Sequence, residues 1–144
     1  MSMTTHMLEA LIALALIAVG GGLGSMARFW VSGVVARRYG ETFPWGTLVV
    51  NVTGSAAIGL AAALLLAPET HAIEHRTAWA GLVIGVLGSY TTVSSFSLQT
   101  LALARNGEIG RALANIVLSL ALCLAAAALG WLGTVQTLAA GGAA

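Results

Sequence analysis

The sequence predicts an all-α membrane protein with four transmembrane helices, the third of them broken near its middle. Of the 144 residues, 58% are hydrophobic and only 8% are charged, and the mean hydropathy is +0.93. Soluble domains usually carry about 25% charged residues. About 20 apolar residues suffice to cross the hydrocarbon core of a bilayer. Four segments lack Asp, Glu, Lys and Arg and can each hold one span: 10–27, 42–68, 77–104 and 112–144.

We expect the four spans at residues 8–36, 46–67, 77–104 and 109–134. The N-terminal sequence MSMTTHMLEA lacks the positively charged start of a secretory signal, so we expect the first span to be retained as a helix. The connections between the spans are too short to form a soluble domain. Residues 1–144 are therefore expected to form a single four-helix transmembrane domain.

The third span is too long for a straight crossing. Residues 77–104 would reach about 42 Å as one α-helix at 1.5 Å per residue, and the hydrocarbon core is about 30 Å thick. The middle of this span reads GSYTTVSSFS, residues 88–97. β-Branched and hydroxyl residues are mediocre helix formers, and their hydroxyls can replace lost backbone partners. Because non-helical backbone is not tolerated against lipid, we predict a helix break that faces a partner or a pore.

Two glycine-rich stretches predict close contacts between helices. The first span contains Gly20-Gly21-Gly22-Leu23-Gly24-Ser25, and the third span places Gly81 and Gly85 four residues apart. Small residues let helix backbones approach closely within a membrane. The alanine-rich fourth span favours the same kind of packing.

Polar side chains within the spans need a partner or a function, because an unsatisfied polar group in hydrocarbon costs several kcal/mol. Arg28 either snorkels to the interface or places a fixed positive charge at the mouth of an anion path. Asn51 either joins two helices or donates its amide N–H to an anion. Polar residues share one helix face at a spacing of four in the second and fourth spans: Thr47, Asn51 and Ser55, then Asn115 and Ser119.

The charge distribution favours an anion as the permeant species. No acidic residue is placed to carry protons or to bind a cation at mid-membrane. The net charge of +1 gives no reason to expect a nucleic-acid partner. The sequence also lacks a His, Cys and Asp cluster with metal-ligand spacing and a serine with a nearby base, so we expect no enzyme. All acidic residues lie in or beside loops and termini: Glu9, Glu41, Glu69, Glu74 and Glu108.

Three segments resemble the Fluc, or CrcB-type, family of fluoride channels. They are Gly22, Gly24 and Ser25 with Arg28-Phe29, then PWGTLVVNVTGS at 44–55, then GSYTTVSSF at 88–96. The resemblance implies a fluoride-selective channel in the bacterial inner membrane that exports F⁻ passively from the cytoplasm. Because HF diffuses into cells and ionises there, such a channel protects against fluoride toxicity.

The resemblance also implies an architecture and a set of site residues. The channel would be an antiparallel, dual-topology homodimer with two pores lined by both copies. A structural Na⁺ at its centre would be held by the backbone carbonyls of Gly88 and Thr91. From the polar stripes and the resemblance together, the residues expected to line the pores or to bind fluoride are Asn51, Phe96, Val93, Ser94, Ser95, Thr47, Asn115, Ser119 and Arg28.

Two positions depart from the family pattern. The family usually has a phenylalanine where this chain has Val93, and often has a tyrosine where this chain has Asn115. In the family, two phenylalanine rings turn their electropositive edges toward fluoride. Phe96 is the ring of that pair that this chain retains, so selectivity or conductance is expected to differ.

Two alternative functions also fit the sequence. A small multidrug-resistance-type transporter has four short spans in a dual-topology dimer, but it needs a glutamate inside the first span, and Glu9 lies too near the start. A non-conducting membrane assembly subunit, held by its glycine faces, is the other alternative. Arginine is biased four to one toward the first and third loops, which favours a cytoplasmic position for them. We expect this small bias to permit a homodimer in which both orientations occur.

Overall fold

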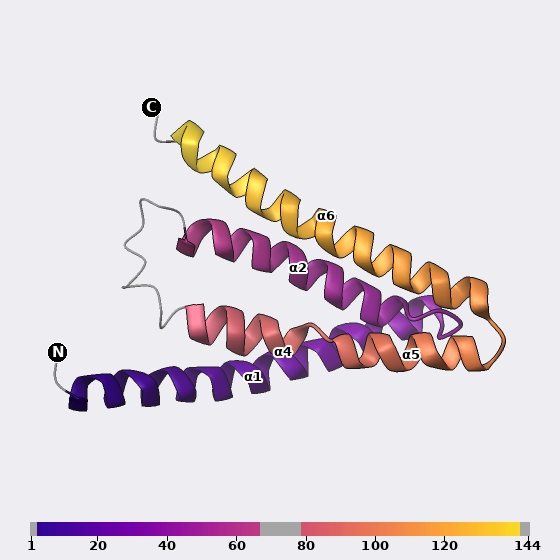
Figure 1. Ribbon diagram of the computed structural model, residues 1–144, viewed down its shortest axis with the longest axis horizontal. Coiled ribbons are helices and arrows are strands. Elements are labelled where there is room, and N and C mark those ends of the chain that lie inside the picture. The colour runs from indigo at the N-terminus through magenta and orange to yellow at the C-terminus, as the bar shows by residue number, and fades with distance from the viewer. Residues whose placement is uncertain (1–2, 67–78, 142–144) are drawn as a thin grey trace.

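The computed structural model describes residues 3–66 and 79–141, and all regular structure within these ranges is helical (Figure 1). The third span is a composite of three short helices, whereas the other spans are single helices. The elements in chain order are α1 (Met3–Tyr39), α2 (Trp45–Leu66), η1 (Ala80–Leu87), α4 (Gly88–Tyr90), α5 (Val93–Arg105) and α6 (Ile109–Gly141).

The prediction of four membrane-spanning segments is confirmed. Two of them extend beyond the expected ranges: α1 continues to Tyr39 and α6 to Gly141. Neither extension contains a proline, so no residue ends these helices early. Residues 77–78 of the expected third span lie outside the described residues. The helical segments long and apolar enough to cross a membrane are His6–Tyr39, Trp45–Leu65, Ala80–Arg105 and Ile109–Gly141.

The first half of the third span is a π-helix, which the sequence analysis did not anticipate. η1 covers eight residues, and its last turn shows the wide hydrogen bonding of this form, since the Gly88 N–H donates to the carbonyl of Val83. Every residue of η1 is small or apolar, so the sequence carries no periodicity that distinguishes a π-helix from an α-helix.

The predicted close helix contacts at the glycine-rich stretches are confirmed, and they join the first span to the third. A Cβ atom on Gly20 would lie 2.7 Å from the carbonyl oxygen of Gly81, and one on Gly24 would overlap the carbonyl oxygen of Val86. From the other side, a Cβ atom on Gly85 would lie 3.2 Å from the Cα of Ile17. The backbones of α1 and η1 therefore touch over more than one turn, as small residues permit.

Substitution of Gly24 by alanine is expected to lower the thermal unfolding temperature of the purified protein. The added methyl group would push into the backbone of η1, and overpacking of this kind costs about 1–3 kcal/mol. Gly22→Ala is the matched control on the same helix, because a Cβ atom at Gly22 meets no neighbouring atom within 4 Å. Equal unfolding temperatures for the two variants would contradict the backbone contact at Gly24.

A second close contact joins α2 to α6. A Cβ atom on Gly59 would overlap the carbonyl oxygen of Ala127, and one on Gly130 would overlap the carbonyl oxygen of Ala56. The contact is thus reciprocal, with one glycine on each helix facing a backbone carbonyl of the other. The small residues of α6 serve packing, as the sequence predicts.

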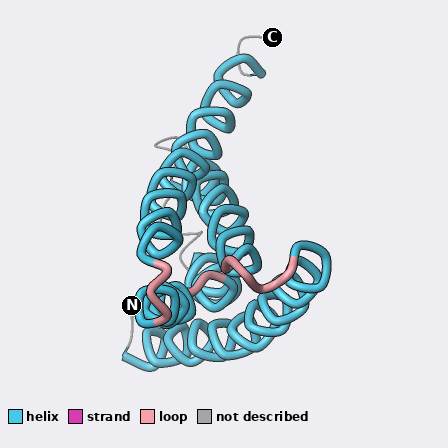
Figure 2. The backbone as a smooth tube through the Cα atoms, turned by 90° about the vertical axis from the view of Figure 1, so that its right-hand side faces the viewer, coloured by secondary structure: helices cyan, strands magenta, loops and turns pink. Residues whose placement is uncertain are grey.

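The loops 40–44 and 106–108 lie at the same end of the molecule (Figure 1), and Figure 2 looks onto this end. Gly40 and Gly107 follow α1 and α5 with φ angles of 79° and 81°, the left-handed conformation that favours glycine. The Gly107 N–H donates to the carbonyl of Ala104, and the Glu108 N–H donates to that of Leu103. These bonds form a Schellman cap, which turns the chain sharply into α6.

Large apolar side chains cover the outside of the described chain. Phe29 is 83% exposed and Leu98 is 69% exposed, whereas Val50 is one of the few large side chains that are fully buried. A soluble protein does not present so much apolar surface to water. This surface suits a surrounding of lipid or of another apolar protein.

Candidate functional site

The third span is interrupted at Thr91 and Thr92, within the stretch where the sequence predicts a break (Figure 1). Thr91 has a ψ of 159°, and Thr92 has φ and ψ of −153° and 123°, so both residues are extended. α5 then begins at Val93, and the hydroxyl of Thr92 accepts the Ser95 N–H at 3.2 Å. Thr92 is therefore the N-cap of the second half-helix.

Asn51 on α2 holds the interrupted backbone with two hydrogen bonds. Its Nδ2 donates to the carbonyl oxygen of Thr92 at 2.9 Å, and its Oδ1 accepts the Thr92 N–H at 2.7 Å. The interpretation of Asn51 as a polar contact between two helices is thus confirmed. Nδ2 carries a second N–H, for which the described residues offer no acceptor.

The break releases the carbonyls of residues 88–91 from helical hydrogen bonding, and those of Gly88 and Thr91 are among them. In an uninterrupted α-helix, the Thr92 N–H would donate to the Gly88 carbonyl, and the Ser95 N–H would donate to the Thr91 carbonyl. Here the first donor is taken by Asn51 and the second by the hydroxyl of Thr92. The released carbonyls include those of the residues that the family resemblance implies as sodium ligands.

Hydroxyl groups cluster at the start of α5. The Thr92 hydroxyl donates to Ser95 Oγ at 3.2 Å and lies 3.1 Å from Ser94 Oγ. Ser94 is exposed, Val93 is 77% exposed and Phe96 is half-buried. The side chains at 93 and 94 therefore face outward from a single copy of the chain.

The absence of a side chain at Gly54 lets α2 approach the break closely. A Cβ atom at this position would overlap Cγ2 of Thr91 and lie 3.2 Å from a ring carbon of Tyr90. On the adjacent residue, the Thr53 hydroxyl lies 3.0 Å from the Tyr90 hydroxyl. The PWGTLVVNVTGS motif thus supplies both the asparagine and the glycine that α2 needs to contact the interrupted span.

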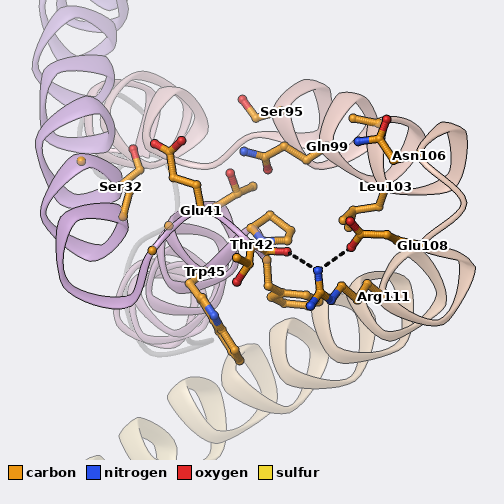
Figure 3. Close-up of a pocket in the computed structure, with 18 of the residues that line it drawn as sticks. Ser32, Glu41, Thr42, Trp45, Ser95, Gln99, Leu103, Asn106, Glu108 and Arg111 are labelled. Atoms are coloured by element: carbon orange, nitrogen blue, oxygen red, sulfur yellow. Dashed lines mark hydrogen bonds and ion pairs between the residues drawn. The ribbon is translucent and has the colours of Figure 1, made fainter.

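A cavity of about 660 Å³ opens at the end of the molecule that carries the loops 40–44 and 106–108 (Figure 3). Thr47 from α2 and Ser95 and Gln99 from α5 line it. The carboxamide oxygen of Gln99 is buried and has no hydrogen-bond partner among the described residues. Ser95 therefore borders both the cavity and the hydroxyl cluster at the break.

The charged residues that line this cavity are Arg111 and two carboxylates, Glu41 and Glu108, and Arg28 does not line it. Arg111 pairs with Glu108 at 2.6 Å and donates to the Thr42 carbonyl at 3.5 Å (Figure 3). Neither Arg111 nor Gln99 is among the site residues predicted from the sequence. The i, i+4 spacing of Ser95 and Gln99 was the signal available for the latter.

Asn115 and Ser119 belong to a buried network between α5 and α6. Asn115 is 1% exposed, and its Nδ2 donates to the Thr100 hydroxyl at 2.8 Å. The Thr100 hydroxyl donates to the Phe96 carbonyl at 2.7 Å, and Ser119 Oγ donates to Asn115 Oδ1 at 3.4 Å. In a single copy these groups join α6 to α5 at the turn that contains Phe96.

Comparison with known proteins agrees with the resemblance seen in the sequence. Residues 15–131 match the family described as "CrcB-like protein, Camphor Resistance (CrcB)". The "Fluoride-specific ion channel FluC 2" of Rhodopseudomonas palustris (strain BisB18) is 56% identical over 126 residues, which cover 87% of this chain and 95% of that protein. The "Fluoride-specific ion channel FluC" of Opitutus terrae (strain DSM 11246 / JCM 15787 / PB90-1) is 57% identical over 119 residues, covering 83% of this chain and 87% of that one. The chain is a multi-pass membrane protein that belongs to the CrcB family of fluoride channels.

Proposed function

We propose that this chain forms a fluoride-selective channel that lets F⁻ leave the cytoplasm passively across the bacterial inner membrane. The observation that carries the proposal is the interrupted third span, where amide and hydroxyl groups gather around Thr92 beside a cavity. Hydrogen-bond donors can replace part of the water that a small anion sheds on entering a pore.

No carboxylate lies in the middle of a span within the described ranges, which supports an anion rather than a cation or proton, while Glu41 and Glu108 line the cavity beside Arg111. Within the described ranges, the carboxylates are Glu9, Glu41 and Glu108, at the start of α1 and in the two loops. Glu69 and Glu74 lie outside the described residues. Carboxylates at membrane depth typically mark proton or cation paths.

The proposed path runs from the cavity along α5 to the break. Thr47 and Ser95 line its wide end, and the second N–H of Asn51 is available as a donor near Thr92. Phe96, Val93 and Ser94 continue the path at the outward side of α5. Asn115 and Ser119 support Phe96 from behind, while Arg28 adds positive charge one turn before the cavity residue Ser32.

We propose that two antiparallel copies form the channel. Gly88 is exposed, and its released carbonyl would face lipid in a single copy, where unsatisfied backbone groups cost several kcal/mol. A second copy of the chain over this region would remove it from lipid. The four-to-one arginine bias is small enough to permit both orientations.

The carbonyls of Gly88 and Thr91 suit a structural Na⁺ between the copies. Hard cations prefer oxygen ligands, and the carbonyls of Gly88 and Thr91 are among those that the break releases in each copy. The ion would supply positive charge to carbonyl oxygens that the break leaves without helical donors. The residues at the break therefore fit the cation that the family resemblance implies.

Sodium is expected to stabilise the purified protein against thermal unfolding. A ligand that binds only the native state at 100 times its dissociation constant stabilises that state by about 2.7 kcal/mol. Unfolding temperatures would be compared in sodium chloride and in N-methylglucamine chloride at equal ionic strength. Equal temperatures over a wide sodium range would contradict the sodium site.

Liposome flux separates the proposed channel from the two alternatives. A channel releases fluoride down its own gradient when the proton gradient is absent, provided that an ionophore balances charge. A small multidrug-resistance-type transporter would instead take up cationic drugs in exchange for protons, and an assembly subunit would do neither. The described part of the first span offers only Glu9 as a coupling carboxylate, close to its start.

A further inference from the structure

We infer that Asn51 also acts on permeation through the backbone of Thr92, as a positioning residue that keeps the third span interrupted. This inference rests on the proposed function only in using fluoride flux as one of its measurements. The observation is the pair of hydrogen bonds, 2.9 and 2.7 Å long, between the Asn51 carboxamide and the Thr92 carbonyl and N–H. The Asn51 side chain thereby satisfies both backbone polar groups of Thr92.

Asn51 prevents the Thr92 N–H from forming the hydrogen bond that it would make in a continuous helix. Without the Oδ1 acceptor, the nearest helical partner of the Thr92 N–H is the Gly88 carbonyl. An unsatisfied N–H in a membrane costs several kcal/mol, so this bond would be strongly favoured. Asn51 therefore keeps the Gly88 carbonyl released and Thr92 extended.

Thr92 transmits this effect to the groups on α5. Its hydroxyl caps α5 by accepting the Ser95 N–H and also donates to Ser95 Oγ, and Ser95 lines the cavity. A turn of Thr92 into helical geometry would move this hydroxyl and break both contacts. The orientation of the polar groups beside the proposed path thus depends on a residue of α2.

Distance measurement across the break tests this role separately from flux. Spin labels would replace Leu82 on η1 and Leu101 on α5, which are both exposed, in a chain whose single cysteine is replaced by Cys123→Ala. Labelled protein would be diluted into excess unlabelled protein, so that only distances within one chain contribute. The labelled parent must conduct as the unlabelled protein does.

In Asn51→Ala, the distance between the labels is expected to shorten by roughly 4 Å. Two extended residues rise about 3.3 Å each, and two helical residues rise 1.5 Å each. Fluoride flux should fall by roughly 100-fold in the same variant, the scale that a displacement of about 1 Å can produce. Asn51→Asp retains an acceptor for the Thr92 N–H but loses the donor, so it should broaden the distance distribution with less shortening.

Ser55→Ala is the matched control for the distance measurement, because Ser55 lies one turn further along the same face of α2. Its distance distribution should equal that of the parent. Loss of flux in Asn51→Ala with an unchanged distance would overturn the inference and assign Asn51 a direct contact with the ion. Should Asn51→Ala fail to assemble, an unchanged distribution in Asn51→Asp would overturn it equally. A parent without fluoride flux would refute the proposed function and leave the distance result valid.

Discussion

Fluoride flux is expected to fall by at least about 100-fold when Asn51 is replaced by Ala or Asp, which corresponds to about 2.7 kcal/mol on the barrier. The alanine removes the donor beside the proposed path and both hydrogen bonds to Thr92. The aspartate adds a negative charge that repels the permeant ion. The protein should still assemble, because the glycine contacts of α1 with η1 and of α2 with α6 remain.

Efflux would be measured with a fluoride electrode from liposomes that hold each purified variant. Size-exclusion chromatography in detergent would compare the assembly of each variant with that of the parent. Gly22→Ala is a suitable control that should conduct normally, since a Cβ atom there meets no neighbouring atom within 4 Å. Parental flux in both Asn51 variants would show that α2 does not contribute to the path.

Phe96→Ile is expected to lower fluoride flux by at least about tenfold, or about 1.4 kcal/mol on the barrier. The substitution keeps apolar bulk but removes the ring, whose electropositive edge attracts an anion without trapping it as an arginine would. Phe96 should be indispensable because the neighbouring family position is occupied by Val93. Leu98→Ile, on the same helix and 69% exposed, provides a control of similar size.

Val93→Phe restores the residue that the family usually has and tests the same role from the opposite side. Val93 is 77% exposed on a single copy, so the larger ring has room within that copy. The variant should conduct at least as well as the parent if the second copy leaves this space open. Blocked flux would show that the partner has packed around valine. Parental efflux from Phe96→Ile would contradict the role of the ring edge, and amide and hydroxyl donors would then have to carry fluoride alone.

Composition and charge patterning were sufficient to predict the four spans. The lengths of uncharged sequence relate directly to the thickness of the bilayer, and the excess length of 77–104 predicts the interruption that the structure places at Thr91 and Thr92. Glycine spacing likewise predicts the contacts at Gly20 and Gly24, because only small residues permit backbones to touch. These features depend on local sequence and on the membrane as solvent.

The partners of polar side chains could not be predicted in the same way. The sequence left Asn51 with two possible roles, and the position of Thr92, 41 residues further along the chain, favours one of them. Asn115 is buried on Thr100 by the packing of α6 on α5, which its i, i+4 relation to Ser119 does not reveal. Such contacts depend on how helices meet, and helix periodicity carries no information about that geometry.

The lining of the cavity also depends on contacts between segments that are distant in the sequence. Arg111 and Gln99 line it from α6 and α5, beside the two loops that contain Gly40 and Gly107. Arg28, which either snorkels to the interface or places a positive charge at the mouth of the path, does not line this cavity. The contributions of Arg28 and of a second copy to the complete channel stay predictions.

Electrode recording of fluoride efflux from liposomes that contain only this purified protein tests the proposed channel most directly. With an ionophore to balance charge and no proton gradient, fluoride should leave rapidly, and chloride in matched liposomes should be retained. That result would establish selective, passive permeation by this chain without another subunit. Fluoride release no faster than from protein-free liposomes, or release only when a proton gradient is imposed, would contradict a self-sufficient fluoride channel.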